Sequence, residues 1–475
     1  MSTTGDSDTI AQTEVETPAS TSTNRRQPYG QGFLDTISEG WAERPDTPSP
    51  ARAQAAYTAA RRDAVSSAFP GRRLVIPAGE LKQRSNDTDY PFRAHSAFSH
   101  LTGWASDAEP GSVLVFDPRE GGDGHDVTLY FRERADRTTA EFYSDASIGE
   151  FWIGPRPALG GVAADLGVPT AHVDDFESRE GDVVLDEDDE LTRFVSELRL
   201  VKDAYEIAQM KLAVDVTARG FDDIVAHLPA IVAHPRGERI VEGVFHQRAR
   251  SDGNAVGYDT IAASGPHACY LHWTRNDGAV VPGDLILIDA GAEVDSLYTA
   301  DITRTLPVSG RFTDIQRRIY ETVREAADAA FAAAKPGVMF RSIHEAAMQV
   351  IATRVAEWGL LPVTAAEALD ADKGGQHRRY MVHGTSHHLG IDVHDCAQAR
   401  RDMYYDGALE PGMVFTIEPG LYFQIDDLTV PEEYRGIGVR IEDDILMTAD
   451  GPVNLSAGIP RTADEVEAWI ARLSA

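Results

Sequence analysis

Short apolar runs separated by longer helical stretches characterise the first half of the chain. The alanine-rich stretch SPARAQAAYTAARRDAVSSAF predicts a helix that ends before Pro70 and Gly71. The apolar runs RLVIPAG, SVLVF and VTLYF follow this helix and predict strands. Because helices and strands alternate, we expect an α/β domain over residues 46–195.

The second half has longer helical stretches and its own set of strand-like runs. The segment DVVLDEDDELTRFVSELRL passes from an acidic, loop-like run into a long helical stretch, which predicts a domain boundary near residue 195. Helical segments at residues 313–333 and 341–358 lie between the strand-like runs DLILIDAG, MVFTIEPGLYF and GVRIEDDILMT. The last helix should begin at Thr462, where Thr-Ala-Asp-Glu forms a capping box. We therefore expect a second domain over residues 196–475.

The N-terminal region differs from both domains in composition. It is rich in Ser, Thr and acidic residues and nearly lacks aromatic side chains, so it cannot bury enough apolar surface to offset the entropy of ordering. We expect residues 1–45 to form a disordered or extended tail. No apolar stretch typical of a secretory signal or a membrane span is present, which predicts a cytoplasmic location.

Overall composition narrows the class of protein. The chain has 475 residues, 42% of them hydrophobic and 25% charged, as expected of a globular protein with two domains. Its formal charge of -32 repels nucleic acid and anionic membrane surfaces, so we expect neither as a partner. The two cysteines, Cys269 and Cys396, are too few for a disulfide framework or a thiolate zinc site.

Two aspartates border a predicted hairpin. The run DLILIDAGAEVDSLYTADITRT reads as two strands around a turn, with Asp295 midway between Asp289 and Asp301. A turn centred there would place the two aspartates directly opposite each other on one face, with β-carbons about 5 Å apart. Burying an unpaired carboxylate is costly unless a cation or proton compensates it. Asp289 alone is most simply a solvated strand-end residue, but the pair favours a metal site.

Two further acidic motifs are ambiguous by themselves. Arg440 and Glu442 in VRIEDD are two residues apart and share one strand face, where an ion pair between them would explain both. Glu418 in FTIEPGLY precedes Pro419 and Gly420 and could simply close a turn.

Histidines are concentrated in HGTSHHLGIDVHD, which contains His383, His387, His388 and His394. Ordinary core packing does not require this density. Together with the acidic residues they form a donor set of mostly hard oxygen atoms, which favours manganese-like ions over zinc held by thiolates or by nitrogen alone. Bridging carboxylates would imply two metal ions.

These motifs, in this order, resemble the signature of the aminopeptidase P and prolidase family of metallopeptidases. The resemblance covers roughly residues 50–470, with weaker matches at HSAFSHLTGW and ELRLVKDAYEI. It implies an α/β (α+β) fold in which a pita-bread catalytic domain follows a smaller N-terminal α/β domain. It also implies a homodimer or homotetramer.

The resemblance carries site roles over to this chain. It implies two divalent ions, most simply Mn2+ with Co2+ or Zn2+ as alternatives, bridged by Asp301 and Glu442. The implied ligands are Asp289, Asp301, His387, Glu418 and Glu442. The further catalytic residues that it implies are His272, His383, His394 and Arg440, the last supporting the bridging glutamate.

A metal-bridged hydroxide would attack the scissile carbonyl, because two metal ions lower the pKa of a shared water toward neutrality. Glu418 would accept a proton from that water, while His383 and His394 would stabilise the oxyanion. One position departs from the family: Ala97 in HSAF stands where relatives often have an acidic residue. Alanine there argues against a cross-domain contact from this position to the metal site, such as one from a neighbouring subunit.

Three classes of function remain: a peptidase acting at proline, a metal-free enzyme such as a creatinase-like amidinohydrolase, and a binding module on the same fold. A set of mutually repulsive carboxylates favours the metal-dependent peptidase. We expect substrates with proline at the second position. Ser386 stands where prolidases usually have glycine, which favours an aminopeptidase that cuts Xaa-Pro-Yaa peptides after Xaa over a prolidase that cuts Xaa-Pro dipeptides.

Overall fold

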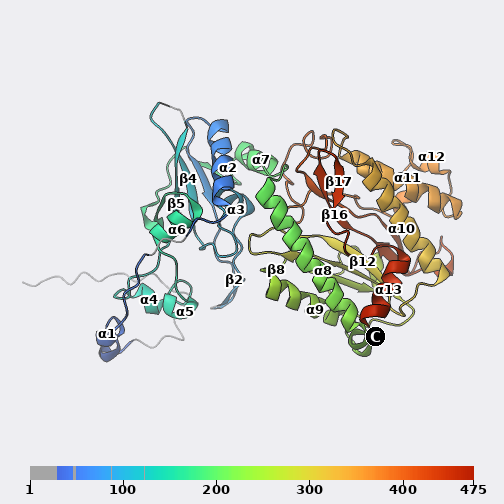
Figure 1. The fold of residues 1–475 in the computed structure, drawn as a ribbon, viewed down its shortest axis with the longest axis horizontal. Helices are drawn as coiled ribbons and strands as arrows, with labels where there is room; N and C mark the ends of the chain where they lie inside the picture. The colour runs from blue at the N-terminus through green and yellow to red at the C-terminus, as the bar shows by residue number, and fades with distance from the viewer. Residues whose placement is uncertain (1–28, 47–49, 87, 122–123, 475) are drawn as a thin grey trace, which may run out of the picture. The chain divides into compact units, whose positions relative to one another are not determined.

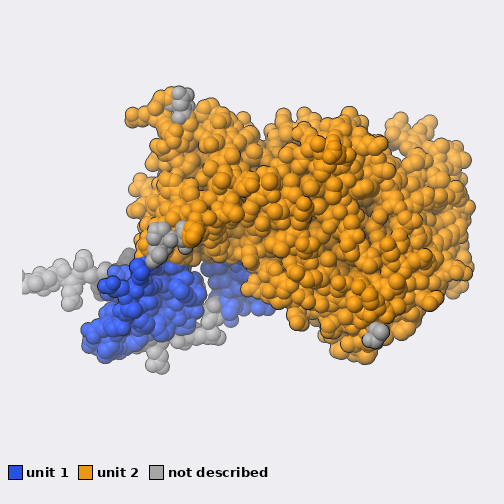
Figure 2. Space-filling view, viewed as in Figure 1, with its two compact units in different colours: residues 1–45, 81–92, 134–156 blue, residues 46–80, 93–133, 157–475 orange. Residues whose placement is uncertain are grey.

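The computed structural model describes residues 29–46, 50–86, 88–121 and 124–474. Its contacts group the chain into two compact units, which are coloured separately in Figure 2. Unit 1 comprises residues 1–45, 81–92 and 134–156, and unit 2 comprises residues 46–80, 93–133 and 157–475. All residues that the sequence predicts for the site belong to unit 2.

Unit 1 is built from short elements. They are α1 Gln31–Ile37, β2 Gln83–Ser85, β3 Thr88–Asp89, α4 Glu141–Ser144 and α5 Glu150–Ile153. Helix α1 falls in the expected tail, so the prediction of a disordered or extended chain is wrong there. Aromatic packing explains the difference, since Phe33 stacks on Tyr29 with ring centroids 4.7 Å apart and meets the edge of Tyr143 at 5.3 Å. The expected tail at residues 1–28 lies outside the described residues.

The first part of unit 2 is a mixed sheet with helices beside it. Its elements are α2 Ala55–Ala68, β1 Leu74–Pro77, α3 Ser96–Thr102, β4 Val113–Pro118, β5 His125–Phe131, α6 Leu159–Leu166, β6 Thr170–His172, η1 Val173–Asp175, β7 Val183–Val184 and α7 Asp189–Glu197. The strand order is β6-β5-β4-β1-β7, antiparallel in the centre and parallel at both edges. The predicted helix is α2 and the three predicted strands are β1, β4 and β5, so these predictions are confirmed.

The remainder of unit 2 combines longer helices with small antiparallel sheets. The helices are α8 Ala204–Ala233, α9 Gly237–Asp252, η2 Gly265–Cys269, α10 Asp314–Ala333, α11 Arg341–Glu357, α12 Ala365–Ala368, η3 Gln376–Arg379, η4 Glu432–Tyr434 and α13 Ala463–Leu473. The strands are β8 Ala255–Val256, β9 Ile261–Ser264, β10 Leu285–Ala290, β11 Ala292–Glu293, β12 Ile302–Pro307, β13 Val414–Ile417, β14 Gly420–Phe423, β15 Ile437–Arg440, β16 Asp443–Thr448 and β17 Gly451–Asn454.

These strands form sheets in the orders β12-β10-β9, β13-β16-β17, β14-β15 and β11-β8. In Figure 1, α8 lies beside α9 and α10 lies beside α11, and both helix pairs contact the strands. The predicted mixture of helices and strands is confirmed. No helix among the described residues is long and apolar enough to cross a membrane.

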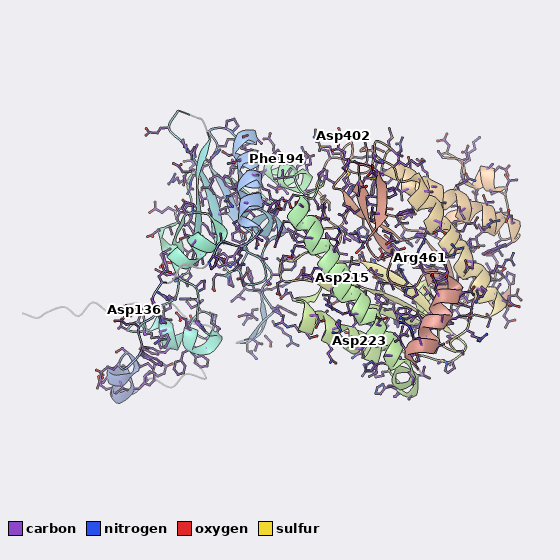
Figure 3. The ribbon with its side chains drawn as sticks, in the orientation of Figure 1. Asp136, Phe194, Asp215, Asp223, Asp402 and Arg461 are labelled. Carbon is purple, nitrogen blue, oxygen red and sulfur yellow. The ribbon has the colours of Figure 1, made fainter. Side chains whose placement is uncertain are left out.

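Helix α8 shows why these helices pack as they do. Its inner face buries Met210 and Phe221 in the core, whereas Asp215 is exposed on its outer face (Figure 3). Asp223, also labelled in Figure 3, accepts hydrogen bonds of 2.6 and 3.1 Å from Arg248 of α9. An apolar stripe opposite a charged face is what holds a surface helix against a sheet.

Strand β10 carries the first predicted ligand into the interior. All six residues of Leu285–Ala290 are buried. Because both faces of this strand are covered, its sequence is a nearly continuous apolar run that is interrupted only by Asp289. A carboxylate in that position needs a compensating charge or proton.

The predicted start of α13 is confirmed. Glu465 N donates to Thr462 Oγ1 at 3.2 Å, and Thr462 N donates to Glu465 Oε2 at 3.0 Å, which completes the capping box. Capping boxes also begin α8, α10 and α12. The same local signal therefore sets the start of four described helices in unit 2.

Replacing Thr462 by alanine should destabilise the first turn of α13 by about 1 kcal/mol, because the Glu465 amide loses its acceptor. Hydrogen exchange followed by mass spectrometry should show faster exchange at the start of α13. Thr353→Ala is the matched control, since the Thr353 hydroxyl donates to the Gln349 carbonyl inside α11 and caps no helix. Equal acceleration at α13 in both variants would contradict the capping role.

Candidate active site

The predicted hairpin forms, but its register differs from the expected one. Asp289 of β10 pairs with Thr303 of β12, and Ala290 pairs with Ile302. Asp301 therefore lies two residues before the partner of Asp289. The prediction that the two aspartates lie directly opposite each other is wrong.

The turn of the hairpin explains this shift. Leu297 N donates to Val294 O at 2.7 Å, Val294 N donates to Tyr298 O at 3.0 Å, and Leu297 has a φ of 68°. A three-residue loop that ends in a left-handed residue centres the turn on Ser296, one residue later than expected. The resulting offset of two residues keeps both aspartates on the same face of the hairpin.

Tyr258 connects the two aspartates. Its hydroxyl lies 2.6 Å from Asp289 Oδ1 and 2.5 Å from Asp301 Oδ1. Sequence reasoning missed this residue, because it lies 31 residues before Asp289 and no local motif marks it. Thr303 was also missed, although the period-two rule places it on the same strand face as Asp301.

Glu442 lies between β15 and β16 and is almost fully buried. Thr303 Oγ1 donates to Glu442 Oε2 at 2.7 Å. Arg440 forms its ion pair with Asp289, Nη2 to Oδ2 at 2.5 Å, in place of the ion pair with Glu442 that the spacing suggested. Arg440 Nε donates to Thr303 Oγ1 at 3.1 Å, so Arg440 reaches Glu442 through Thr303.

His387 reaches the carboxylates from the loop before β13. Its Nε2 lies 3.3 Å from Asp301 Oδ2 and 3.8 Å from Glu418 Oε1. The backbone explains this position, since Thr416 N of β13 donates to His387 O at 2.9 Å. Glu418 follows directly at the end of the same strand. The loop and the strand end therefore deliver both side chains together.

The other histidines of this segment have different surroundings. His383 Nε2 lies 2.8 Å from the Tyr422 hydroxyl. The rings of His394 and His387 have centroids 4.1 Å apart. His388 is fully buried and stacks on a phenylalanine ring, so it belongs to the hydrophobic core.

All nine residues predicted for the site line one cavity of about 340 Å³. They are His272, Asp289, Asp301, His383, His387, His394, Glu418, Arg440 and Glu442. Leu271, Gly384 and Ser386 complete the lining. The structure thus brings together residues that span more than 170 positions of the chain.

Comparison with known proteins identifies the family. Residues 208–449 match the model of metallopeptidase family M24, and residues 58–189 match that of the aminopeptidase P N-terminal domain. The chain belongs to the aminopeptidase P group of metallopeptidase family M24. The resemblance seen in the sequence is confirmed.

Relatives cover nearly the whole chain. Xaa-Pro aminopeptidase 1 of Streptomyces coelicolor is 49% identical over 97% of this chain and 96% of the relative. Xaa-Pro aminopeptidase 2 of the same organism is 51% identical over 92% of this chain and 95% of the relative. The structure of aminopeptidase PepP from Pseudomonas aeruginosa has a TM-score of 0.76 and 31% identity, and covers 89% of this chain and 99% of that one.

A zinc-substituted aminopeptidase P of Escherichia coli in complex with product also has a TM-score of 0.76, with 30% identity over 90% of this chain and 100% of that chain. These likenesses confirm the predicted fold class. An N-terminal α/β domain precedes a pita-bread catalytic domain of the M24 type.

The M24 site concentrates buried negative charge. Burial, and then the charges of Asp301, Glu418 and Asp289, raise the pKa of Glu442 well above its usual value. Burial likewise raises the pKa of Glu418 to about 7, although the charge of His387 opposes it. At neutral pH the metal-free site therefore retains protons on these carboxylates.

The pKa values of the two histidines nearest the carboxylates are shifted in opposite directions. Burial favours the neutral ring of His387, but the hydrogen bond and charge of Asp301 outweigh it and raise the pKa of His387 to about 9. Burial, followed by the charge of Arg440, lowers the pKa of His383 to about 3. His387 is therefore protonated and His383 neutral in metal-free protein at pH 7.

The donor set fits divalent metal ions. Ligand atoms lie within 4.8 Å of one another in three groups: Asp289 with Asp301 and Glu442, His387 with Glu418 and Glu442, and Asp301 with His387 and His394. Buried carboxylates this close together need cations or protons to compensate them. Oxygen-rich donor sets suit hard divalent cations. Geometry and family together imply a divalent-metal centre.

Metal binding should release protons, and the apparent affinity should rise with pH. His387, which the sequence predicts to be a ligand, must be neutral to bind a metal. With its pKa of about 9, each pH unit below that value should lower the affinity about ten-fold. Glu418, with a pKa of about 7, adds further competition by protons below neutrality. The affinity should level off above about pH 9.

Isothermal titration of metal-free protein with manganese at several pH values measures this dependence. A titration of a chelator in the same buffers provides the control for metal speciation. An affinity that is the same at pH 6.5 and pH 8.5 would show that His387 carries no competing proton.

Proposed function

We propose that this chain is a metal-dependent Xaa-Pro aminopeptidase, which releases the N-terminal residue from peptides with proline at the second position. The observation that carries this proposal is the convergence of four carboxylates and His387 on one cavity, in a chain 49% identical to Xaa-Pro aminopeptidase 1 of Streptomyces coelicolor. A metal-free enzyme or a binding module has no need for buried carboxylates that repel one another.

The proposed ligands of two divalent ions are Asp289, Asp301, His387, Glu418 and Glu442. Among the carboxylates, Asp301 and Glu442 are the two that belong to more than one group of close donor atoms, which supports a bridging role for both. Because oxygen donors predominate, we favour manganese over cobalt or zinc. Bound ions supply a water of lowered pKa and polarise the scissile carbonyl.

Glu418 is the proposed acceptor of the proton from the attacking water. A pKa of about 7 suits a carboxylate that takes and returns a proton near neutral pH. His383 Nδ1 lies 3.6 Å from Glu418 Oε2. Both side chains line the cavity that would hold the scissile bond.

Hydrogen bonds orient the neutral ring of His383. Nδ1 donates to the Gly384 carbonyl at 2.6 Å, and the Tyr422 hydroxyl donates to Nε2 at 2.8 Å. Arg440 Nη1 donates to the same hydroxyl at 3.2 Å, so the hydroxyl hydrogen is directed at His383. The network therefore assigns the ring proton to Nδ1. Arg440 supports the site through this contact and through Thr303.

His394 and His272 are the proposed contacts with the peptide. His394 is the more exposed partner of His387 and would stabilise the oxyanion of the attacked carbonyl. His272, beside Leu271, would form a wall of the proline pocket. Such a pocket can select proline by shape, because the ring is compact and the imide nitrogen has no hydrogen to donate.

We propose the domain boundaries 46–195 and 196–475. The matches to the two family models, at residues 58–189 and 208–449, support this division. The proposed boundary lies near the end of α7 Asp189–Glu197, shortly before the break that precedes α8 at Ala204. Residues 1–45 remain outside both proposed domains.

A cytoplasmic location and a homodimer or homotetramer complete the proposal. Cys269 and Cys396 are both buried and free, which is compatible with a reducing compartment. The formal charge of -32 argues against nucleic acid and anionic membranes as partners. Size-exclusion chromatography with light scattering would measure the oligomeric state.

Chelation should abolish hydrolysis, because the buried carboxylates then have only protons to compensate them. Manganese added to the chelated protein should restore activity. Hydrolysis of Ala-Pro-Ala, followed with metal content by mass spectrometry, checks both steps, and chelator saturated with calcium serves as the control. Full activity in metal-free protein would rule out the metal-dependent reaction.

Ala-Pro-Ala should be cleaved after the first residue, whereas Ala-Pro should be a poor substrate. Part of the binding energy is expected to come from the residue after proline. A comparison of kcat/KM for the two peptides measures the difference, and Ala-Ala-Ala tests the need for proline. A clear preference for Ala-Pro would make the enzyme a prolidase, and cleavage of neither peptide would favour a binding module.

A further inference from the structure

Residues 390–395, called the His394 loop below, form a tight turn beside His387. Asp395 N donates to His388 O at 2.9 Å and closes the turn. The ring of His394 extends from this turn toward the ring of His387. The position of His394 therefore depends on what holds its neighbours in the loop.

Two side chains from the part of the chain that matches the aminopeptidase P N-terminal domain bind Ile391 and Asp392 of this loop. Ser96 Oγ donates to Asp392 Oδ1 at 2.5 Å. Arg93 Nη2 donates to Ile391 O at 2.7 Å, and Arg93 Nη1 lies 3.5 Å from Asp392 Oδ1. Backbone and side chain of the loop are thus both bound.

Arg93 is itself fixed to the hairpin that bears Asp301. Its Nε donates to Glu293 Oε2 at 2.7 Å, and Glu293 is buried in β11. Asn254 Nδ2 donates to the other oxygen of the same carboxylate at 2.8 Å. The Arg93 guanidinium bonds both Glu293 and the Ile391 carbonyl, so it has little freedom to move. A shift of the hairpin should therefore shift the His394 loop.

Buried charged side chains hold Asp395, the last residue of the loop. Arg199 Nε donates to Asp395 Oδ1 at 2.9 Å, and Lys202 Nζ lies 3.5 Å from Asp395 Oδ2, with all three side chains buried. His394 therefore lies between two anchored residues, Asp392 before it in the sequence and Asp395 after it. A change in either anchor should move the ring.

The departure from the family at Ala97 leaves this contact in place. Ala97 is buried in α3 and has no polar side-chain atom. Its neighbour Ser96 and the preceding Arg93 make the polar contacts with the loop. The N-terminal part of the chain thus contacts the His394 loop without the acidic residue that relatives often have.

We propose that Ser96 and Arg93 are positioning residues for His394, so that the N-terminal domain helps to place a catalytic ring of the M24 domain. This inference rests on the proposed function, in which His394 contacts the attacked carbonyl. Displacing a catalytic group by about 1 Å can lower a rate up to about a hundred-fold. Ser96 and Arg93 do not line the cavity, so they act through the loop.

Ser96→Ala removes one hydroxyl, and Ser99→Ala is its matched control on the same helix, because Ser99 Oγ is buried with no hydrogen-bond partner among the described residues. In the manganese-loaded full chain, Ser96→Ala should lower kcat for Ala-Pro-Ala about ten-fold with KM within about two-fold. Ser99→Ala should have the kcat and KM of the parent, and both variants should keep their manganese. Loss of manganese or an unchanged kcat in Ser96→Ala would overturn the proposal.

Combining Ser96→Ala with His394→Ala tests whether the effect passes through His394. In the His394→Ala background, Ser96→Ala should change kcat by less than about two-fold, because the ring to be positioned is gone. The same should hold for Arg93→Lys, which keeps the charge but loses the planar fork that bonds both Ile391 and Glu293.

A ten-fold loss in both backgrounds would assign Ser96 a general structural role and overturn the proposal. If His394→Ala retains the parental kcat, the role of His394 fails and the positioning proposal fails with it. Abolition of activity by chelation would in that case still support the metallopeptidase assignment, so the two failures are distinguishable.

Discussion

Three buried carboxylates and the partly buried carboxylate of Glu418, gathered around one cavity, are the constraint on which the site depends. Asp289, Asp301, Glu418 and Glu442 cannot all be ionised in a buried site without compensating positive charge. The raised pKa values of Glu418 and Glu442 express this conflict in the metal-free protein. Arg440 and protonated His387 provide part of the compensation, and the oxygen-rich arrangement leaves the remainder to divalent cations.

Such a cluster persists only if the backbone holds each carboxylate in place. Strand β12 does this with consecutive residues on its two faces. Thr303 bonds the carboxylate of Glu442 at 2.7 Å, while Arg304, on the opposite face, donates to the Glu442 carbonyl at 2.6 Å and to Asp443 Oδ1 at 2.7 Å. Side chain and backbone of Glu442, a proposed ligand, are thus fixed by neighbouring positions on one strand.

Much of this arrangement could be predicted from the sequence, because it follows from local patterns. Apolar runs marked the strands, one capping box marked the start of the last helix, and the order of motifs indicated the family. The hairpin register could not be predicted, since it depends on the left-handed conformation of Leu297, a residue type that rarely adopts it. Tyr258 and the Asp289 partner of Arg440 required long-range contacts that no local pattern encodes.

Long-range contacts also connect residues outside the catalytic domain with the loop that carries His394. The four proposed carboxylate ligands lie on a strand or directly beside a strand end, whereas His394 lies in a loop. Loops keep a fixed geometry only where other groups bind them. Within the catalytic domain the loop has the closing bond from Asp395 to His388. Arg199 and Lys202 hold Asp395 from within the same domain. Two further anchors, Ser96 and Arg93, come from the N-terminal part of the chain, and Arg93 also bonds the hairpin of Asp301. One guanidinium thereby links the hairpin that bears Asp301 to the loop that carries His394, although neither Arg93 nor Ser96 lines the cavity.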